Sequence, residues 1–140
     1  MLPTVDFCGL RVTRLIIGAN PFGGYSHQNR ERDEEMRAYY TVPRIIETWE
    51  RAEAAGINTM ITNNETPHVL EAVRQYLSAG GSLQWIAQVK PKVDDLAWDT
   101  KLAVDNGAVG IYVQGGVADD FAGKGRVDLL GKCLEIIKRN

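Results

Sequence analysis

The stretch Arg14-Leu-Ile-Ile-Gly-Ala-Asn-Pro-Phe-Gly-Gly24 joins a short apolar run to residues that end a strand. Leu15, Ile16 and Ile17 are too few for a helix, and such a run is typical of a strand that is covered on both faces in a parallel sheet. The glycines and the proline that follow stop the strand and open a loop. Ligands of parallel α/β sheets bind where the strands end, so residues 19–24 are the first candidate functional segment.

The rest of the chain repeats this strand-then-helix pattern. The expected strands are residues 15–19, 57–62, 83–90 and 109–114, and the expected helices are residues 43–55, 67–79, 94–105 and the segment that begins at Asp128. Residues 4–13 alternate around Gly9, which predicts a β-hairpin before the first strand. Two long loops are also expected. One is residues 21–40, whose charge cluster at 30–37 favours either a solvated helical turn or a surface loop, and the other is the glycine-rich segment 115–126.

Strands that alternate with helices predict right-handed crossovers and a parallel sheet. We therefore expect residues 1–140 to form a single α/β domain, in which a short hairpin precedes four βα units of a TIM barrel. A closed barrel of eight strands needs about 250 residues, so four units make about half of one. Four parallel strands leave two open edges. The expectation is the amino-terminal half of a (β/α)8 barrel, truncated or completed by self-association through its open sheet edges.

Composition argues against several classes of function. With 140 residues, of which 44% are hydrophobic, the chain can build one core. A net charge of −2 with dispersed basic residues argues against a nucleic-acid partner. No apolar stretch approaches the ~20 residues that cross a bilayer, and the first residues lack the regions of a signal peptide, so no membrane partner is expected. Cys8 and Cys133 stand in unrelated contexts, which predicts reduced thiols in a cytoplasmic protein.

Strand parity predicts which side chains face a ligand. Along 83–90, apolar side chains alternate with a set that ends at Lys90. The apolar set should face the helices, which leaves Lys90 on the opposite face at the carboxyl end of its strand. The same alternation along 109–114 places Gln114 beside it. Along 57–62 the alternation does not show which side chains face the helices, because apolar residues occur at both the odd and the even positions.

Residues 8–24, Cys-Gly-Leu-Arg-Val-Thr-Arg-Leu-Ile-Ile-Gly-Ala-Asn-Pro-Phe-Gly-Gly, resemble the opening of the aldo-keto reductase family. Ala54-Ala-Gly-Ile-Asn58 resembles that family's lead into its second strand. The resemblance covers the first sixty or so residues by sequence and the remainder by topology. It implies a TIM barrel and, in active members, an oxidoreductase that reduces carbonyl groups with NADP.

The resemblance carries over only part of the family's catalytic set, which is an Asp ending strand two, a Tyr just after it, a Lys ending strand three and a His ending strand four. Lys90 matches the Lys, whereas Ile61 stands at the Asp position, the Tyr position falls near Thr66, and Gln114 stands at the His position. The oxygen that forms on reduction needs a proton donor, whose pKa the Lys and Asp lower. The usual reductase mechanism is therefore not expected within these 140 residues.

The family's cofactor site lies mostly in strands beyond this segment. NADP is therefore expected only in a full-length parent protein, with Ala19 and Asn20 as the candidate cofactor contacts, and no cofactor is expected for this chain alone. A metal is a further alternative, because Glu65-x-x-His68 has helical ligand spacing, and His27, Asp119 or Asp120 could complete a site. A single such pair is a weak signal, and Glu65 at a helix start also complements the helix dipole. No metal is assigned.

Polar residues at the strand ends form the candidate site. Lys90 and Gln114 are the candidate catalytic residues, and the candidate substrate-binding residues are Asn20, Asn63, Asn64 and Glu65. Amides donate and accept without the desolvation cost of a charge, which suits a small polar carbonyl or sugar-like ligand. Lys90 could bind an anion, polarise a carbonyl or form a Schiff base, or it could simply pair with Glu65 or with an aspartate across the rim. The alternatives to a reductase-like enzyme are a non-catalytic binding protein, a self-associating half-barrel and a metal-assisted enzyme.

Overall fold

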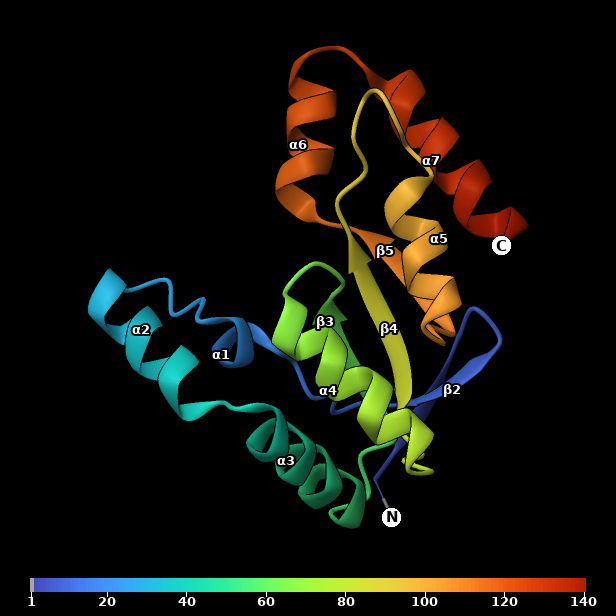
Figure 1. Cartoon of the computed structure of the whole chain (residues 1–140). Helices are drawn as coiled ribbons and strands as arrows, with labels where there is room; N and C mark the ends of the chain where they lie inside the picture. Colours follow the sequence, from blue (N-terminus) through green and yellow to red (C-terminus); the bar gives the residue numbers. More distant parts are fainter. Residues whose placement is uncertain (1) are drawn as a thin grey trace.

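A computed structural model describes residues 2–140 of the chain, and its first element is the expected hairpin (Figure 1). β1 (Thr4–Phe7) pairs antiparallel with β2 (Leu10–Thr13). Cys8 and Gly9 form the turn, with φ of 52° and 83°. Positive φ at both turn residues matches the twist of the flanking strands, which is why a two-residue connection suffices. The hairpin prediction is confirmed.

A separate sheet of three parallel strands forms the centre of the molecule, in the order β3-β4-β5. Its strands are β3 (Thr59–Asn63), β4 (Gln84–Val89) and β5 (Gly110–Val113). α4 (Pro67–Ser78) connects β3 to β4, and α5 (Trp98–Asp105) connects β4 to β5. In this register the three strands end at the same edge, as parallel pairing requires.

The predicted strand at residues 15–19 is not a strand, and this corrects the expected architecture. Among the described residues, the segment joins the sheet at Ile17 alone, whose N–H donates to the Thr59 carbonyl (3.2 Å) and whose carbonyl accepts from the Ile61 N–H (2.9 Å). Leu15 is 58% exposed, so the apolar run is not covered on both faces. The chain is therefore an α/β protein with a two-stranded antiparallel sheet and a three-stranded parallel sheet; half of a TIM barrel with four βα units is wrong.

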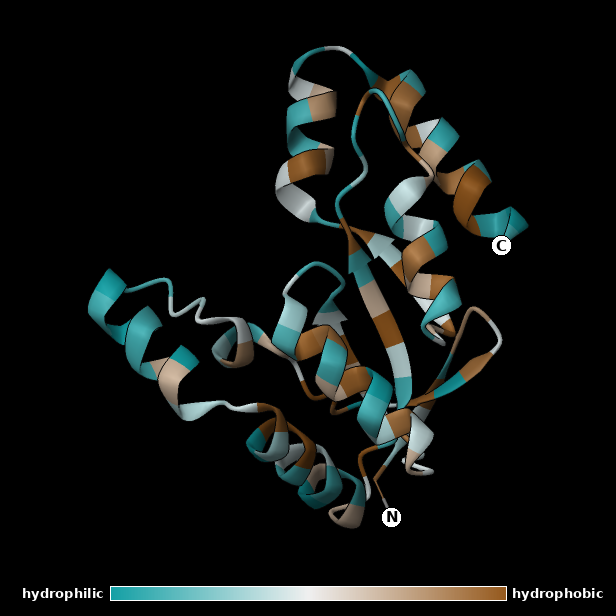
Figure 2. Cartoon of the chain, viewed as in Figure 1, coloured by the Kyte–Doolittle hydropathy of each residue, from teal (hydrophilic) through white to brown (hydrophobic). Residues whose placement is uncertain are grey.

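The main core lies between one face of the parallel sheet and the helices that cover it. α3 (Val42–Ala54) and α4 pack against this face, and Trp49 and Trp85 are almost completely buried between them. Figure 2 shows apolar residues recurring along β4 and on these two helices. The Trp85 indole N–H donates to the Thr62 hydroxyl (2.9 Å), which satisfies a polar group inside the core. The pocket described below lies on the opposite face of the sheet.

The segment predicted as a loop at residues 21–40 contains two helices, α1 (Asn20–Gly23) and α2 (Arg30–Tyr39). No residue of α2, all of which the structure describes, is buried, so the charge cluster forms a solvated helix and not the surface loop that was the other alternative. Asp33 of α2 accepts a hydrogen bond from the backbone N–H of Ser26 (2.7 Å). This polar contact helps to hold α2, which projects away from the sheet, against the chain that follows α1 (Figure 1).

The glycine-rich segment predicted as a loop at residues 115–126 is largely helical, so that prediction is wrong. It forms α6 (Gly115–Gly123), and α7 (Val127–Arg139) follows. The Gln114 side chain caps α6 by accepting from the Val117 N–H (2.9 Å), and Phe121 anchors it in a second apolar cluster with two residues of α7. One of these is Cys133; both it and Cys8 are free thiols. No helix within residues 2–140 is long and apolar enough to cross a membrane.

Candidate functional site

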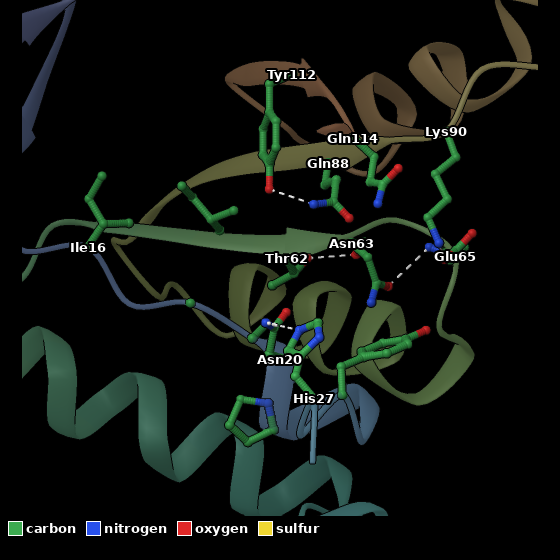
Figure 3. Close-up of a pocket in the computed structure, with 15 residues that line it drawn as sticks. Ile16, Asn20, His27, Thr62, Asn63, Glu65, Gln88, Lys90, Tyr112 and Gln114 are labelled. Carbon is green, nitrogen blue, oxygen red and sulfur yellow. Dashed lines mark hydrogen bonds and ion pairs between the residues drawn. The ribbon is translucent and has the colours of Figure 1, made fainter. Parts of the chain in front are cut away.

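A cavity of about 640 Å³ opens on the face of the parallel sheet opposite α3 and α4, at the carboxyl ends of the strands. The hairpin covers the other end of this face, where the Gln84 side chain donates to the Arg11 carbonyl of β2 (2.9 Å). The cavity is therefore open toward the loops that follow β3, β4 and β5 (Figure 3). Its polar lining consists of Asn20, Tyr25, His27, Thr62, Asn63, Glu65, Gln88, Lys90, Tyr112 and Gln114.

Lys90 and Glu65 form an ion pair at the rim of the cavity, in which the Lys90 ammonium donates to a Glu65 carboxylate oxygen. The strand alternation of β4 carries Lys90 to this face, and Glu65 lies in the β3–α4 loop. Asn63 holds that loop by accepting from the Glu65 N–H (3.3 Å) and from the Thr66 N–H (3.0 Å). The hydrogen bond from Lys90 to Glu65 raises the pKa of Lys90 above its ordinary value. The amine therefore stays protonated, which suits hydrogen bonding and opposes the lowered pKa that a Schiff base needs.

The wall opposite the sheet comes from the segment that begins α1 and leads to α2. The Asn20 side-chain N–H donates to Nε2 of His27 (3.2 Å). His27 has a φ of 57°, a left-handed backbone that L residues rarely adopt. Tyr25 lies in the same segment and is 42% exposed. Three polar side chains of this segment thus reach the cavity from outside the sheet, and Figure 3 labels two of them, Asn20 and His27.

The floor of the cavity is formed by β4 and β5. The Gln88 side-chain N–H donates to the Tyr112 hydroxyl oxygen (2.8 Å), and both residues point away from the helices. Gln114 follows β5 and lies on the same face. Its side-chain oxygen Oε1 accepts from the Val117 N–H of α6. The side-chain NH₂ of Gln114 has no hydrogen-bond partner among the described residues.

The structure brings together most of the residues predicted from the sequence. Of the predicted site residues, Ala19, Asn20, Asn63, Glu65, Lys90 and Gln114 all line the cavity. Asn64 does not: it lies in the β3–α4 loop but is 1% exposed, and its side chain donates to Asp99. Tyr25, Gln88 and Tyr112 were not predicted as site residues. Gln88 shares the parity of Lys90, and Tyr112 that of Gln114, so the alternation held a signal for both.

Most of the residues weighed as metal ligands are engaged elsewhere. Glu65 pairs with Lys90, and His68 donates from Nε2 to the Phe22 carbonyl (2.7 Å). Asp120, on α6, pairs with Lys124. Within residues 2–140 no three His, Cys, Asp or Glu side chains gather as a group that could hold a metal ion.

Comparisons of the chain with protein-family models, with curated proteins and with solved structures found no match. The resemblance to aldo-keto reductases therefore stays a prediction made from the opening residues. What the chain does has to be argued from the cavity and from the chemistry of the side chains that line it.

Proposed function

We propose that the cavity binds a small, uncharged organic molecule rich in hydroxyl or carbonyl groups, such as a sugar-like compound. The observation that carries this proposal is a cavity of about 640 Å³ in which one ammonium–carboxylate pair is surrounded by amides and phenols. The volume of the cavity is within the usual range for small-molecule sites. The cavity also lies at the carboxyl ends of parallel strands, where α/β proteins commonly bind ligands.

The charge of the cavity favours an uncharged ligand. Lys90 is the only Lys or Arg among the described residues that line it, and Glu65 already neutralises it. An anion would have to displace the Glu65 carboxylate or lie close to it, which costs electrostatic energy. A hydroxyl or carbonyl oxygen can instead accept one of the remaining ammonium N–H groups while the ion pair stays intact.

The unpaired hydrogen-bonding groups of the lining form a mixed set of donors and acceptors. The donors without a partner among the described residues include the side-chain NH₂ groups of Asn63 and Gln114. The acceptors include the side-chain oxygens of Asn20 and Gln88, whose NH₂ groups are engaged by His27 and Tyr112. A hydroxyl group donates and accepts at once, so a polyhydroxylated ligand matches such a set better than a purely accepting one.

Calorimetric titration with a panel of neutral aldoses, ketoses and polyols, beside the corresponding sugar phosphates and sugar acids, tests the proposal. We expect saturable binding of at least one neutral compound, with affinity weakened about tenfold in Lys90→Ala, the usual cost of losing a hydrogen bond from a charged group. Lys92→Ala is the matched control, because the Lys92 ammonium lies over the Trp98 ring (4.5 Å to its centre) rather than in the cavity. Binding of the anionic compounds alone would contradict the proposal.

A second candidate is an NADP-linked oxidoreductase acting on a carbonyl group of such a ligand. Its support is that Tyr25 and Tyr112 bring phenols to the same cavity as Lys90, whereas the sequence position near Thr66 offers none. The described lining does not fit a whole dinucleotide, because its one ammonium is paired with Glu65 and no further Lys or Arg is present for the phosphates. Titration of NADPH fluorescence is the test: saturable quenching together with carbonyl-dependent oxidation would favour this candidate, and unchanged fluorescence would remove it for this chain.

A further inference from the structure

A buried polar pair lies directly behind the Lys90–Glu65 ion pair. Asn64 and Asp99 are each 1% exposed. The Asn64 side-chain NH₂ donates both to the Asp99 carboxylate oxygen Oδ1 (2.7 Å) and to the Asp99 backbone carbonyl (2.9 Å). The other carboxylate oxygen, Oδ2, accepts from the backbone N–H of Lys90 (2.6 Å). One carboxylate of α5 therefore binds the loop after β3 and the residue after β4 at the same time.

These contacts connect the two residues of the ion pair through the backbone. Asn64 immediately precedes Glu65 in the chain, and the Lys90 backbone is held by Asp99 itself. The Lys90 side chain then reaches Glu65 on the cavity side. These contacts form a closed circuit of side chains and backbone. The circuit fixes the positions of the two backbone segments from which the Lys90 and Glu65 side chains extend.

Burying the Asn64–Asp99 pair costs more free energy than a simple apolar packing contact would. A buried carboxylate loses its hydration, and Asn64 Oδ1 has no hydrogen-bond partner in the described part of the chain. Apolar side chains could hold α5 against β4 without these losses. What the polar pair adds is direction, because hydrogen bonds set the separation and angle of the two backbone segments more narrowly than apolar contacts do.

We propose that Asp99, acting with Asn64, is the positioning residue of the Lys90–Glu65 pair, and that it holds the two backbones at the separation at which their side chains meet in the cavity. The consequence for ligand binding rests on the proposed function, since only then does the pair contact a ligand. Asp99 itself lies outside the cavity lining, so its effect reaches the ligand through Lys90 and Glu65.

The titration of the Lys90 amine reports on this geometry without any ligand. Reductive ¹³C-methylation of the lysines followed by NMR gives the pKa of each amine, and Lys90→Arg identifies the signal. Glu65→Gln should lower the pKa of Lys90 toward its ordinary value of 10.5, which shows how much the pairing contributes. Asn64→Ala keeps the negative charge of Asp99 but removes the connection to the Glu65 loop, and it should lower the pKa of Lys90 in the same direction. Asp99→Asn should do so as well.

Thr100→Ala is the matched control, because Thr100 is the next residue of α5 and is 3% exposed, yet it has no part in the circuit. Its variant should leave the titration of Lys90 unchanged. An unchanged pKa of Lys90 in folded Asn64→Ala would overturn the proposal. If that variant does not fold, amide hydrogen exchange of the unmodified protein decides: exchange of the Lys90 N–H as slow as that of the interior amides of β4 supports the proposal, and exchange as fast as that of Lys92 overturns it.

The failure of this proposal can be told apart from the failure of the proposed function. If the pKa of Lys90 falls in Asn64→Ala but no neutral compound of the panel binds the unmodified protein, then the positioning role stands and the ligand proposal fails. If a neutral compound binds and Asn64→Ala leaves both its affinity and the Lys90 titration unchanged, then the positioning role fails. When both proposals hold, Asn64→Ala weakens binding by about tenfold, as losing a hydrogen bond to a charged group does.

Discussion

Tyr76→Phe tests the polar cluster that joins α3, α4 and the start of β4. Tyr76 is 2% exposed, and its hydroxyl donates to Oε2 of Glu53 (2.5 Å) and accepts from the Leu83 N–H (3.2 Å). The substitution removes a hydrogen bond to a charged group and leaves a buried N–H without its acceptor, while the ring stays packed. We expect the free energy of unfolding to fall by about 3 kcal/mol.

Urea unfolding followed by circular dichroism measures this loss, and the slope of the free energy with urea should stay unchanged. Tyr112→Phe is the matched control, because its hydroxyl takes part in one exposed hydrogen bond with Gln88, and its cost should stay within about 0.5 kcal/mol. Equal losses in the two variants, or a loss below about 1 kcal/mol in Tyr76→Phe, would refute the reasoning.

Tyr76 should also make the free energy of unfolding depend on pH in the alkaline range. Burial, and then the hydrogen bond to Glu53, raises the pKa of Tyr76 from 10.0 to about 12. Because the folded pKa lies above the unfolded one, the stabilisation is complete below pH 10.0 and is lost as the pH rises to about 12. A difference of about two units corresponds to about 2.7 kcal/mol, so unfolding curves of the unmodified protein and of Tyr76→Phe should converge across this window.

Three further changes test other parts of the fold. Asn58→Ala should lower stability by about 2 kcal/mol and speed amide exchange in the hairpin, because its side chain bonds both a backbone N–H (2.8 Å) and a backbone carbonyl (2.8 Å) of β2. Gly81→Ala should lower the free energy of unfolding in urea by about 2 kcal/mol, because an added Cβ would lie 2.3 Å from the Tyr76 ring. Gly131→Ala should instead raise the free energy of unfolding by about 0.5 kcal/mol, because an added Cβ inside α7 would meet no described atom within 4 Å. Hydrogen bonds from Ser26 lower the pKa of Asp33. The contact between α2 and the chain after α1 should therefore be fully stabilised above the ordinary pKa of that carboxyl, and it should be lost as the pH falls through the lowered pKa. Amide exchange within α2, followed against pH, measures this, and exchange that does not change with pH would contradict it.

Periodicity in the sequence predicted the elements whose apolar residues pack against the sheet. β4 and α4 follow it closely, because each buries one regular set of side chains. The run at residues 15–17 misled the prediction, since three apolar residues in a row look alike whether the chain pairs along its length or at Ile17 alone. α6 was missed because its stability comes from tertiary contacts: Phe121 packs against α7, and Gln114 caps the helix despite the glycines of its first turn.

The candidate site was predictable where a side chain belongs to a strand, and less so where it belongs to a loop. Alternation along β4 and β5 placed Lys90 and Gln114 on one face, and both line the cavity. At the end of β3 the parity was ambiguous, and there one of two adjacent amides was misplaced: Asn63 lines the cavity, and Asn64 turns to the other side. The partner of Asn64 lies 35 residues further along the chain, a separation that no local pattern reports.

α2 has a consequence for how the wall of the cavity can vary. All ten of its residues stay outside the core, and the Ser26–Asp33 hydrogen bond is one of the contacts that hold it to the chain after α1. Tyr25 and His27, which line the cavity, precede this helix in the chain. Insertions or exchanges at residues 26–39 should therefore reshape the mouth of the cavity while the sheet keeps its packing.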